Sequence, residues 1–229
     1  MTKKFWDDEY SKANHLTLSD DPAEDLGKFV RWVVRNAEWP PFPEGGFVLD
    51  VGCGNGRNII SLCREAHMEG LGIDISSTAL TLAHKMAKGL PIIFKEQTAS
   101  KPFPVADQSV DVVLDMMSTH FLNKKEREAY RDELVRVMKP YGWFFFKTFV
   151  LDGDLHAKRL ILEHPTDEEN SYMHPKIKSQ EHVWTEEEIQ EFFSPYFKIY
   201  KMIKSYKHIY QGKAFKRRTI SVYMERLRD

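Results

Sequence analysis

The sequence predicts a doubly wound α/β fold, in which helices cover both faces of a mostly parallel sheet. Segments rich in Val, Ile and Phe alternate with amphipathic segments along most of the chain. A cluster of glycines also stands directly between the first strand-like segment and the helix-like segment after it. With 229 residues, the chain is long enough for one domain with a sizeable core.

The first half of the chain predicts a regular succession of elements. Apolar runs that end at Gly, Ser or Pro predict strands, and apolar residues at helical spacing predict helices. A helix over 21–38 precedes the first strand and has Phe29, Trp32 and Val33 on one side. We then expect, in chain order, a strand at 47–51, a helix at 57–66, a strand at 71–75, a helix at 78–88 and strands at 91–96 and 110–116.

The second half predicts a helix over 124–138, which Lys139–Gly142 ends, and a fifth strand over 143–150. The polar stretch 151–184 has no clean period, as is typical of a lid or binding insert. Thr185 and Glu188 have the spacing of a capping box, and they precede a helix with Ile189, Phe192 and Phe193. The last strands, about 197–206 and 218–227, are connected through Gln211 and Gly212, which predicts an antiparallel hairpin at one edge of the sheet.

The composition narrows the class of protein. The formal net charge is −1, so the chain as a whole requires neither a nucleic acid nor a membrane as partner. Cys53 and Cys63 are the only cysteines, too few for a disulfide framework or a paired-cysteine zinc site, so we expect no metal. The first 20 residues lack a secretory apolar stretch, and no segment is apolar for the ~18 residues that span a bilayer. We expect an unprocessed cytoplasmic protein.

The glycines at 52, 54 and 56 predict a ligand site. Between a strand and a helix, glycine lets the backbone approach a ligand that faces the helix N–H groups. Asp74 ends the second strand roughly 20 residues later, where an acidic side chain accepts the hydroxyls of an adenosine ribose. Together they predict an adenosine-containing cofactor. The alternative is that the glycines form only a tight turn and Asp74 caps the next helix.

Asp50 distinguishes between the cofactors of this kind. It lies inside an apolar strand, two residues before the first glycine. A carboxylate buried there needs a cationic partner. It would repel a pyrophosphate and attract the amino group of a methionine moiety, which favours S-adenosylmethionine over a dinucleotide.

The stretch Val48–Gly56 closely resembles the first motif of class I S-adenosylmethionine-dependent methyltransferases, which have a Rossmann-like fold. The resemblance continues through Gly72–Ser76, through Pro102–Pro104 before Asp111–Val113, and through Met138–Gly142. It covers roughly 45–150. The implied organisation is a single methyltransferase domain over 1–229, with a cap and helix at 1–44, a cofactor-binding core at 45–150, a substrate lid at 151–184 and a helix with the hairpin at 185–229.

The resemblance also implies roles for single residues. Asp50 would orient the amine of the methionine moiety, and Asp74 would hold the ribose, with Ile75 against the adenine. Gln97 or its neighbour Thr98 would replace the Asp that bonds the adenine amino group in many relatives. The methionine end would be lined by Gly52, Cys53, Gly54, Asn55 and Gly56, and the sulfonium would be bordered by Asp115 and Met116. The product would be S-adenosylhomocysteine.

Two segments are candidates for the acceptor side. Trp6, Tyr10 and His15 lie in or near a Trp-Asp-Asp-Glu-Tyr stretch, which is similar to segments that cover the cofactor in small-molecule methyltransferases of the thiopurine and tellurite-resistance type. The alternative is that they pack onto the sheet edge. Tyr10 is also a candidate catalytic residue. His120 follows the fourth strand, where the family approaches its substrate, and is the candidate proton acceptor, with an ordinary pKa near 6.5. It could instead simply cap the strand end.

The C-terminal hairpin is rich in cations and opens a second hypothesis. These residues form either a solvated face or a site for an anion, to which Lys147 could add. Our first hypothesis is methyl transfer by in-line displacement to a small or medium-sized metabolite, with an anionic one left open. The alternatives are an RNA or protein acceptor docked on the hairpin, and a cofactor-binding module without catalysis. The cations are Lys198, Lys201, Lys204, Lys207, Lys213, Lys216, Arg217 and Arg218.

Overall fold

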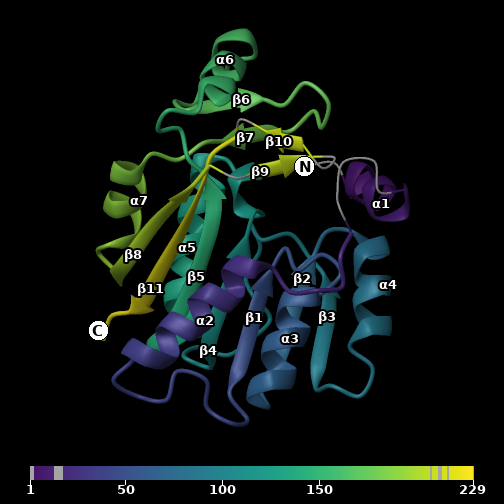
Figure 1. The fold of residues 1–229 in the computed structure, drawn as a ribbon, viewed down its shortest axis with the longest axis vertical. Helices are drawn as coiled ribbons and strands as arrows, with labels where there is room; N and C mark the ends of the chain where they lie inside the picture. The colour runs from purple at the N-terminus through teal and green to yellow at the C-terminus, as the bar shows by residue number, and fades with distance from the viewer. Residues whose placement is uncertain (1–2, 13–17, 207, 211–212, 216, 229) are drawn as a thin grey trace.

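The protein is described by a computed structural model that covers residues 3–12, 18–206, 208–210, 213–215 and 217–228. A seven-stranded sheet forms its centre, in the order β3-β2-β1-β4-β5-β11-β8 (Figure 1). The strands β1 to β5 are parallel, and β11 is antiparallel to both of its neighbours. The predicted fold class, with its antiparallel pair at one edge, is confirmed. The strands of this sheet are β1 Phe47–Val51, β2 Glu69–Asp74, β3 Ile92–Glu96, β4 Val110–Met116, β5 Met138–Phe149, β8 Phe197–Ser205 and β11 Thr219–Arg226.

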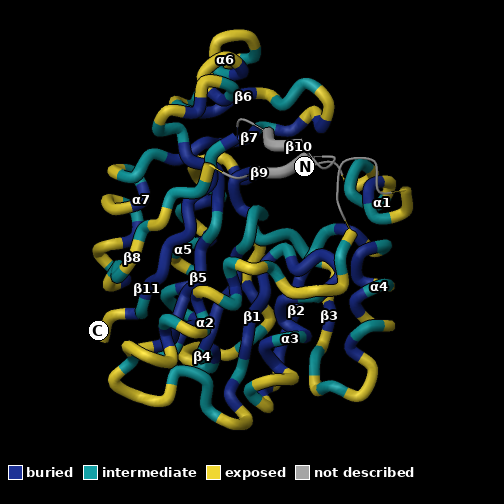
Figure 2. The backbone as a smooth tube through the Cα atoms, in the orientation of Figure 1, coloured by how far each residue is buried: buried dark blue, intermediate teal, exposed yellow. Residues whose placement is uncertain are grey.

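Helices lie on both faces of the sheet. The residues of β4 and β5 alternate between the two faces because successive side chains of a strand point to opposite sides. Val112 and Phe145 join the core beneath α2, α3 and α4, whereas Val113 and Phe144 join the core beneath α5 and α7. Figure 2 shows the inner strands, such as β1, β4 and β11, buried along most of their length, whereas β3 and β8 at the two edges are mostly intermediate or exposed. These helices are α2 Glu24–Asn36, α3 Arg57–Ala66, α4 Ser77–Met86, α5 Lys124–Val137 and α7 Glu186–Phe193.

The predicted strands and helices up to residue 150 are present, with small shifts of their ends. The largest shift concerns Lys139–Gly142, which we expected to stop a helix and form a turn. The helix α5 ends at Val137, and Met138 is already extended, so β5 begins there and reaches its regular pairing with β4 through a register shift. The helix α1, Lys3–Lys12, precedes α2 and contacts α4. No helix within the described ranges has the length and apolar character of a membrane span.

The segment 151–184, hereafter the insert, is more ordered than predicted. It contains α6, Leu155–Glu163, and the antiparallel pair β6, Ser171–Met173, and β7, Gln180–His182. Asp154 caps α6, whose Ala157 and Leu160 are buried in a small cluster of their own. The elements are too short for their periodicity to stand out in the sequence. The insert lies beyond the ends of the parallel strands, at the top of Figure 1.

The chain between β8 and β11 also differs from the prediction of one short connection. A further antiparallel pair stands there, formed by β9, His208–Tyr210, and β10, Lys213–Phe215. Gln211 and Gly212 lie outside the described residues. At α7, Thr185 accepts a hydrogen bond from the backbone of Glu188, as predicted, but the Glu188 carboxylate contacts His182 at 2.8 Å.

Phe29 of α2 provides a test of this packing. Its ring is fully buried, stacks on Phe145 with 4.9 Å between the ring centroids, and meets Tyr223 edge-on. We expect Phe29→Ala to lower the free energy of unfolding by about 3–5 kcal/mol because it leaves a cavity at the sheet face. Urea denaturation measures this loss. Val34→Ala on the same helix, where the side chain is 60% exposed, should change stability by less than about 0.5 kcal/mol.

Candidate cofactor and acceptor site

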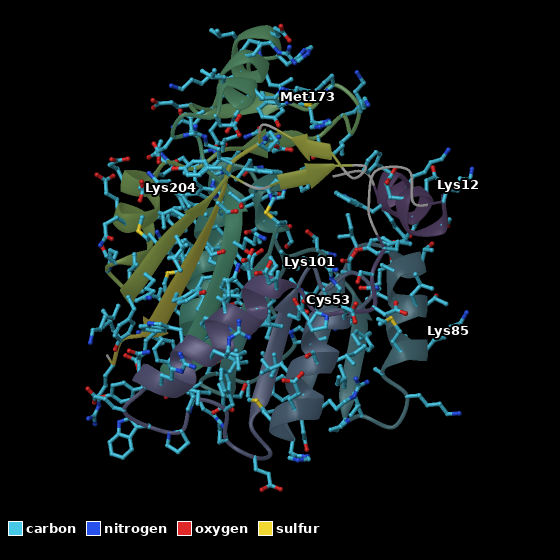
Figure 3. All side chains as sticks on the ribbon, in the orientation of Figure 1. Lys12, Cys53, Lys85, Lys101, Met173 and Lys204 are labelled. Atoms are coloured by element: carbon cyan, nitrogen blue, oxygen red, sulfur yellow. The ribbon has the colours of Figure 1, made fainter. Side chains whose placement is uncertain are left out.

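The predicted site residues gather where the parallel strands end. The glycine loop follows β1, the 3₁₀ helix η1, Thr119–Phe121, follows β4, and the insert follows β5. In Figure 3, Cys53 marks the glycine loop, and Met173 marks the insert above it in this view. The carboxyl ends of parallel strands share one edge of a sheet, so these segments surround one region.

The backbone of the glycine loop requires glycine. Gly54 has a φ of +57°, and a Cβ added there would collide with the hydroxyl of Tyr10. Gly52 has a φ of +70°, and its Cβ would collide with Ser118, just before η1. L-residues rarely adopt this conformation. The loop therefore brings the chain before His120 and the side chain of Tyr10 against its own backbone.

Asp74 holds the glycine loop in place. One carboxylate oxygen accepts a hydrogen bond from the backbone N–H of Gly54 at 2.9 Å, and the other accepts one from Ser76 at 2.8 Å. Burial raises the pKa of this carboxyl group, while the hydrogen bonds oppose the rise. Each carboxylate oxygen has a further lone pair, which leaves acceptor capacity for the ribose hydroxyls. Asp74 thus supports the start of α4, as the alternative proposed, and its role in holding the ribose stays a prediction.

Asp50 lies fully inside the sheet. One of its carboxylate oxygens is buried and has no hydrogen-bond partner within the described structure. Burial, reinforced by the charges of Asp115 and Asp74, raises the pKa of Asp50 to about 8. A buried acceptor without a donor is costly, and an amino group beside it removes that cost. The orphaned oxygen and the tight glycine loop fit the methionine end of S-adenosylmethionine.

Asp115 and Met116 point to opposite sides of β4. Asp115 accepts hydrogen bonds from Tyr130 of α5, at 3.0 Å, and from Thr119 of η1, and burial raises the pKa of its carboxyl group to about 6. Met116 receives the amide of Asn58 at its sulfur. Asp115 therefore anchors η1, and its predicted place beside the sulfonium remains a prediction.

The remaining predicted cofactor residues line the neighbouring turns. The backbone N–H of Gln97 donates to the backbone carbonyl of Asp74, and its side-chain amide donates to the backbone carbonyl of Pro102. Thr98 pairs with Ser100. The side chain of Asn55 donates to the backbone of Ser19. Ile75 is half-buried, and Cys53 is buried beside the loop backbone. These side chains thus already contribute to the shape of the site.

The helix α1 covers the glycine loop. Tyr10 reaches Gly54, and burial raises the pKa of its phenol. Asp7 accepts hydrogen bonds from Ser76 and Thr78 at the start of α4. Trp6 packs edge-on against Phe121 with 5.7 Å between the ring centroids. These contacts agree with the covering role and also with the alternative of packing onto the sheet edge, whereas His15 lies outside the described residues.

His120 is enclosed by aromatic rings. Its ring lies 4.2 Å from that of Phe121 and 5.2 Å from that of Phe149, centroid to centroid. The side chain is buried, and Nδ1 has no hydrogen-bond partner within the described structure. Burial lowers the pKa of His120 to about 4. The ordinary pKa near 6.5 assumed from the sequence is therefore wrong for this protein without ligands.

The described cations of the predicted anion site have partners. Lys147 forms an ion pair with Asp25 of α2 at 2.6 Å. Lys204 pairs with Glu186, while Lys198 and Lys201 lie over the rings of Tyr200 and Trp32. Three further predicted cations, Lys207, Lys213 and Lys216, fall where no side chain is described.

Arg217 has a role that the sequence reasoning missed. It is buried and contacts Glu181 of β7 at 2.8 Å, Tyr172 of β6 at 3.0 Å and Asp154, the cap of α6, at 3.3 Å. Tyr172 also donates to Glu181. Glu181, Tyr172 and Asp154 belong to the insert. The sequence of the insert has no clear periodicity from which their burial could be predicted. The one available signal was Asp154, which precedes a short helix in the position of an N-cap.

Comparisons with known proteins indicate the same class of protein. Residues 48–142 match the family model described as a methyltransferase domain. A solved S-adenosylmethionine-dependent methyltransferase of Methanosarcina mazei has the same fold, with a TM-score of 0.70, 23% identity and coverage of 86% of this chain and 98% of that one. Fold, site and matches together support a class I methyltransferase domain that uses S-adenosylmethionine.

Curated relatives differ in what their names say they methylate. The fatty-acid O-methyltransferase of Mycolicibacterium smegmatis is 25% identical over 154 residues, which are 63% of this chain and 55% of that protein. The EEF1A lysine methyltransferase 2 of Danio rerio is 27% identical over 164 residues, 62% of this chain and 66% of that protein. The chain spans about half to two thirds of the length of the curated relatives it matches.

Asp50 predicts a pH dependence of stability. Because its pKa is raised from 3.8 to about 8, the folded protein without cofactor keeps a proton that the unfolded chain loses. This contribution to stability is complete below pH 3.8 and is lost as the pH rises through about 8. Thermal unfolding between pH 6 and 9 should therefore show a smaller loss of stability for Asp50→Asn than for the parent. Asp115→Asn, whose parent group titrates near 6, should instead remove the dependence at lower pH. Equal slopes for Asp50→Asn and the parent would contradict the burial of an unpaired acid.

Asp74 predicts the strength of cofactor binding. Asp74→Ala should weaken the binding of S-adenosylhomocysteine at least about tenfold, because charge-assisted hydrogen bonds contribute about 1.5–3 kcal/mol each. Isothermal titration calorimetry measures the affinity. Asp132→Ala, where the side chain is 65% exposed on α5, is the control and should bind like the parent. Parent-like affinity in a folded Asp74→Ala variant would reject the ribose assignment.

Proposed function

We propose that this chain transfers the methyl group of S-adenosylmethionine to a small or medium-sized metabolite by in-line displacement. The observation that carries this proposal is the cover formed by α1: Tyr10 reaches the glycine loop, and Trp6 meets Phe121 of η1. A segment that closes over the cofactor suits an acceptor small enough to be enclosed with it. It also supports the likeness to methyltransferases of the thiopurine and tellurite-resistance type.

The charges of the hairpin favour a metabolite over RNA. An RNA surface needs cations that are available to phosphates. The charge of Lys204 is paired with Glu186, whereas Lys201 is exposed and lies over the ring of Trp32, so Lys204 is neutralised within the protein. Lys147 is likewise neutralised by Asp25, which weakens the case for an anionic metabolite.

The residues of the chain would align the reactants and receive a proton. Bound S-adenosylmethionine supplies a methyl group already activated by the sulfonium. Asp50 and Asp74 would hold its two ends, and the aromatic rings at Trp6 and Phe121 would exclude water. His120, neutral at any working pH because its pKa is lowered to about 4, would accept the proton of a protic acceptor.

The test is a screen of thiol, amine, hydroxyl and carboxylate acceptors, followed by His120→Ala on the best one. Formation of S-adenosylhomocysteine reports turnover. We expect His120→Ala to lower turnover by about 10²–10⁴ with little change in S-adenosylhomocysteine affinity, while the cavity left by the buried ring lowers the melting temperature. The parent should show no fall in turnover between pH 8 and 6 that depends on His120, since its lowered pKa keeps it neutral there.

Two results would contradict the proposal. Turnover on none of the small acceptors, together with a salt-sensitive shift of cellular RNA in a mobility assay, would favour the macromolecular alternative. Full turnover of His120→Ala on the best acceptor would remove the proton acceptor and leave alignment as the source of catalysis.

A further inference from the structure

The insert contains a buried carboxylate on β7, the strand that packs on η1. Glu181 of β7 is 2% exposed, and Tyr172 and Arg217 both donate to its carboxylate. Burial opposes its ionisation, but the positive charge of Arg217 lowers the pKa of Glu181, which therefore stays ionised. A charged carboxylate in the interior persists only where such partners fix it.

This carboxylate lies on the element that packs against His120. The strand β7 packs on η1, which contains His120. A second route runs through Phe149 of β5, since the Arg217 guanidinium lies 3.6 Å from the centre of its ring and the ring of His120 meets its edge. Phe149 thus contacts both His120 and Arg217, and Arg217 pairs with Glu181 of β7.

The other charged and titratable groups around His120 act in the opposite sense. Arg217 just before β11, His174 between β6 and β7, and His182 of β7 each disfavour a proton on the imidazole, as does burial. From β5 the ring of Phe149 contacts it, and from α1 Trp6 contacts its neighbour Phe121. Among the principal influences on the imidazole, Glu181 is the one that favours the proton.

We propose that Glu181 is a positioning residue of the reaction, the fixed counter-charge that the insert supplies to His120 when His120 takes the proton of the acceptor. This inference rests on the proposed function of His120. The insert would then complete the chemical site as well as cover it. The acceptor class that needs such a pair carries a weakly acidic O–H or N–H, because an acceptor that is already ionised has no proton to give.

The step balances without a further reactant. The oxygen or nitrogen of the acceptor forms a bond to the methyl carbon, and the carbon–sulfur bond breaks with its electron pair on sulfur. The proton of the acceptor passes to the unpartnered Nδ1 of His120. The charge of Glu181 stabilises the imidazolium so formed, and the proton leaves to water after the product departs.

The decisive experiment is an NMR titration of the imidazole of His120 in the full chain saturated with S-adenosylhomocysteine, with His120→Ala to assign the signal. Glu181→Gln keeps the volume of the side chain and removes its charge. We expect the titration midpoint of His120 to fall by about half a pH unit or more, because a nearby negative charge is lost. Loosening of the insert would let in water and move the midpoint the other way, toward the ordinary 6.5.

Matched variants separate charge from packing. Glu181→Asp disturbs the packing and keeps the charge, so its midpoint should not fall. Tyr172→Phe removes a hydrogen bond to Glu181 without changing a formal charge, and its midpoint should stay within about 0.2 units of the parent. Glu181→Met is a second neutral variant, for use if Glu181→Gln does not fold. An unchanged or raised midpoint in the folded neutral variant overturns the proposal.

Kinetics supply an independent readout. On the best acceptor, Glu181→Gln should lower turnover by about tenfold with an unchanged KM for S-adenosylmethionine, and the loss should grow as the acceptor becomes less acidic. Combined with His120→Ala it should cost no more than about twofold beyond His120→Ala alone, because Glu181 acts through His120. Additive losses overturn the proposal. Lack of turnover by the parent would refute the proposed function, whereas the titration would still decide on Glu181.

Discussion

The carboxylate of Asp74 is the constraint from which the cofactor edge of the protein is built. It ends β2 and holds the backbone of Gly54 and Ser76, so one side chain joins the glycine loop to the start of α4. Ser76 in turn donates to Asp7 of α1. A helix that begins before the sheet is thereby attached to the loop that it covers. Glycine allows the left-handed backbone of the loop, and the hydrogen bonds to Asp74 hold the loop in that conformation.

The surroundings of the buried acids keep their carboxyl groups protonated to a higher pH than usual. Asp50 and Asp115 both have raised pKa values because burial disfavours their charged forms. A cationic ligand reverses that balance for Asp50, since an amino group beside the orphaned oxygen favours the ionised acid. Methyl transfer removes the charge of the sulfonium but leaves the amino group. A contact with Asp50 would therefore hold both cofactor and product, and a preference for the cofactor would come from groups near the sulfur.

A feature of the structure could be predicted from the sequence when the residues that cause it are close together in the chain. The glycine loop, Asp50 and Asp74 could be placed because their roles follow from a strand, a turn and a helix that are neighbours in the chain. The environment of His120 could not be read in this way. The rings and charges that surround it come from η1, β5, the insert and the chain before β11, which meet only in the folded protein. The lowered pKa of His120 therefore results from contacts that form only in the folded protein.

The insert shows the same limit at the level of elements. Its short helix and strands lack the periodicity of longer ones, and what fixes them is a buried set of charges. Arg217 had been counted among the cations of a solvated or anion-binding face, yet it lies inside, against Glu181 and Asp154. Taking these charges out of water is costly, and an apolar contact would hold the insert with less penalty. The arrangement is best understood if the position of the carboxylate itself matters. An apolar contact could hold the insert in several registers, whereas an arginine shared by two carboxylates and a tyrosine meets all three in one. That one register sets Glu181 on β7, the strand that packs on η1, so the cost of burying charge is offset by a fixed position of this carboxylate.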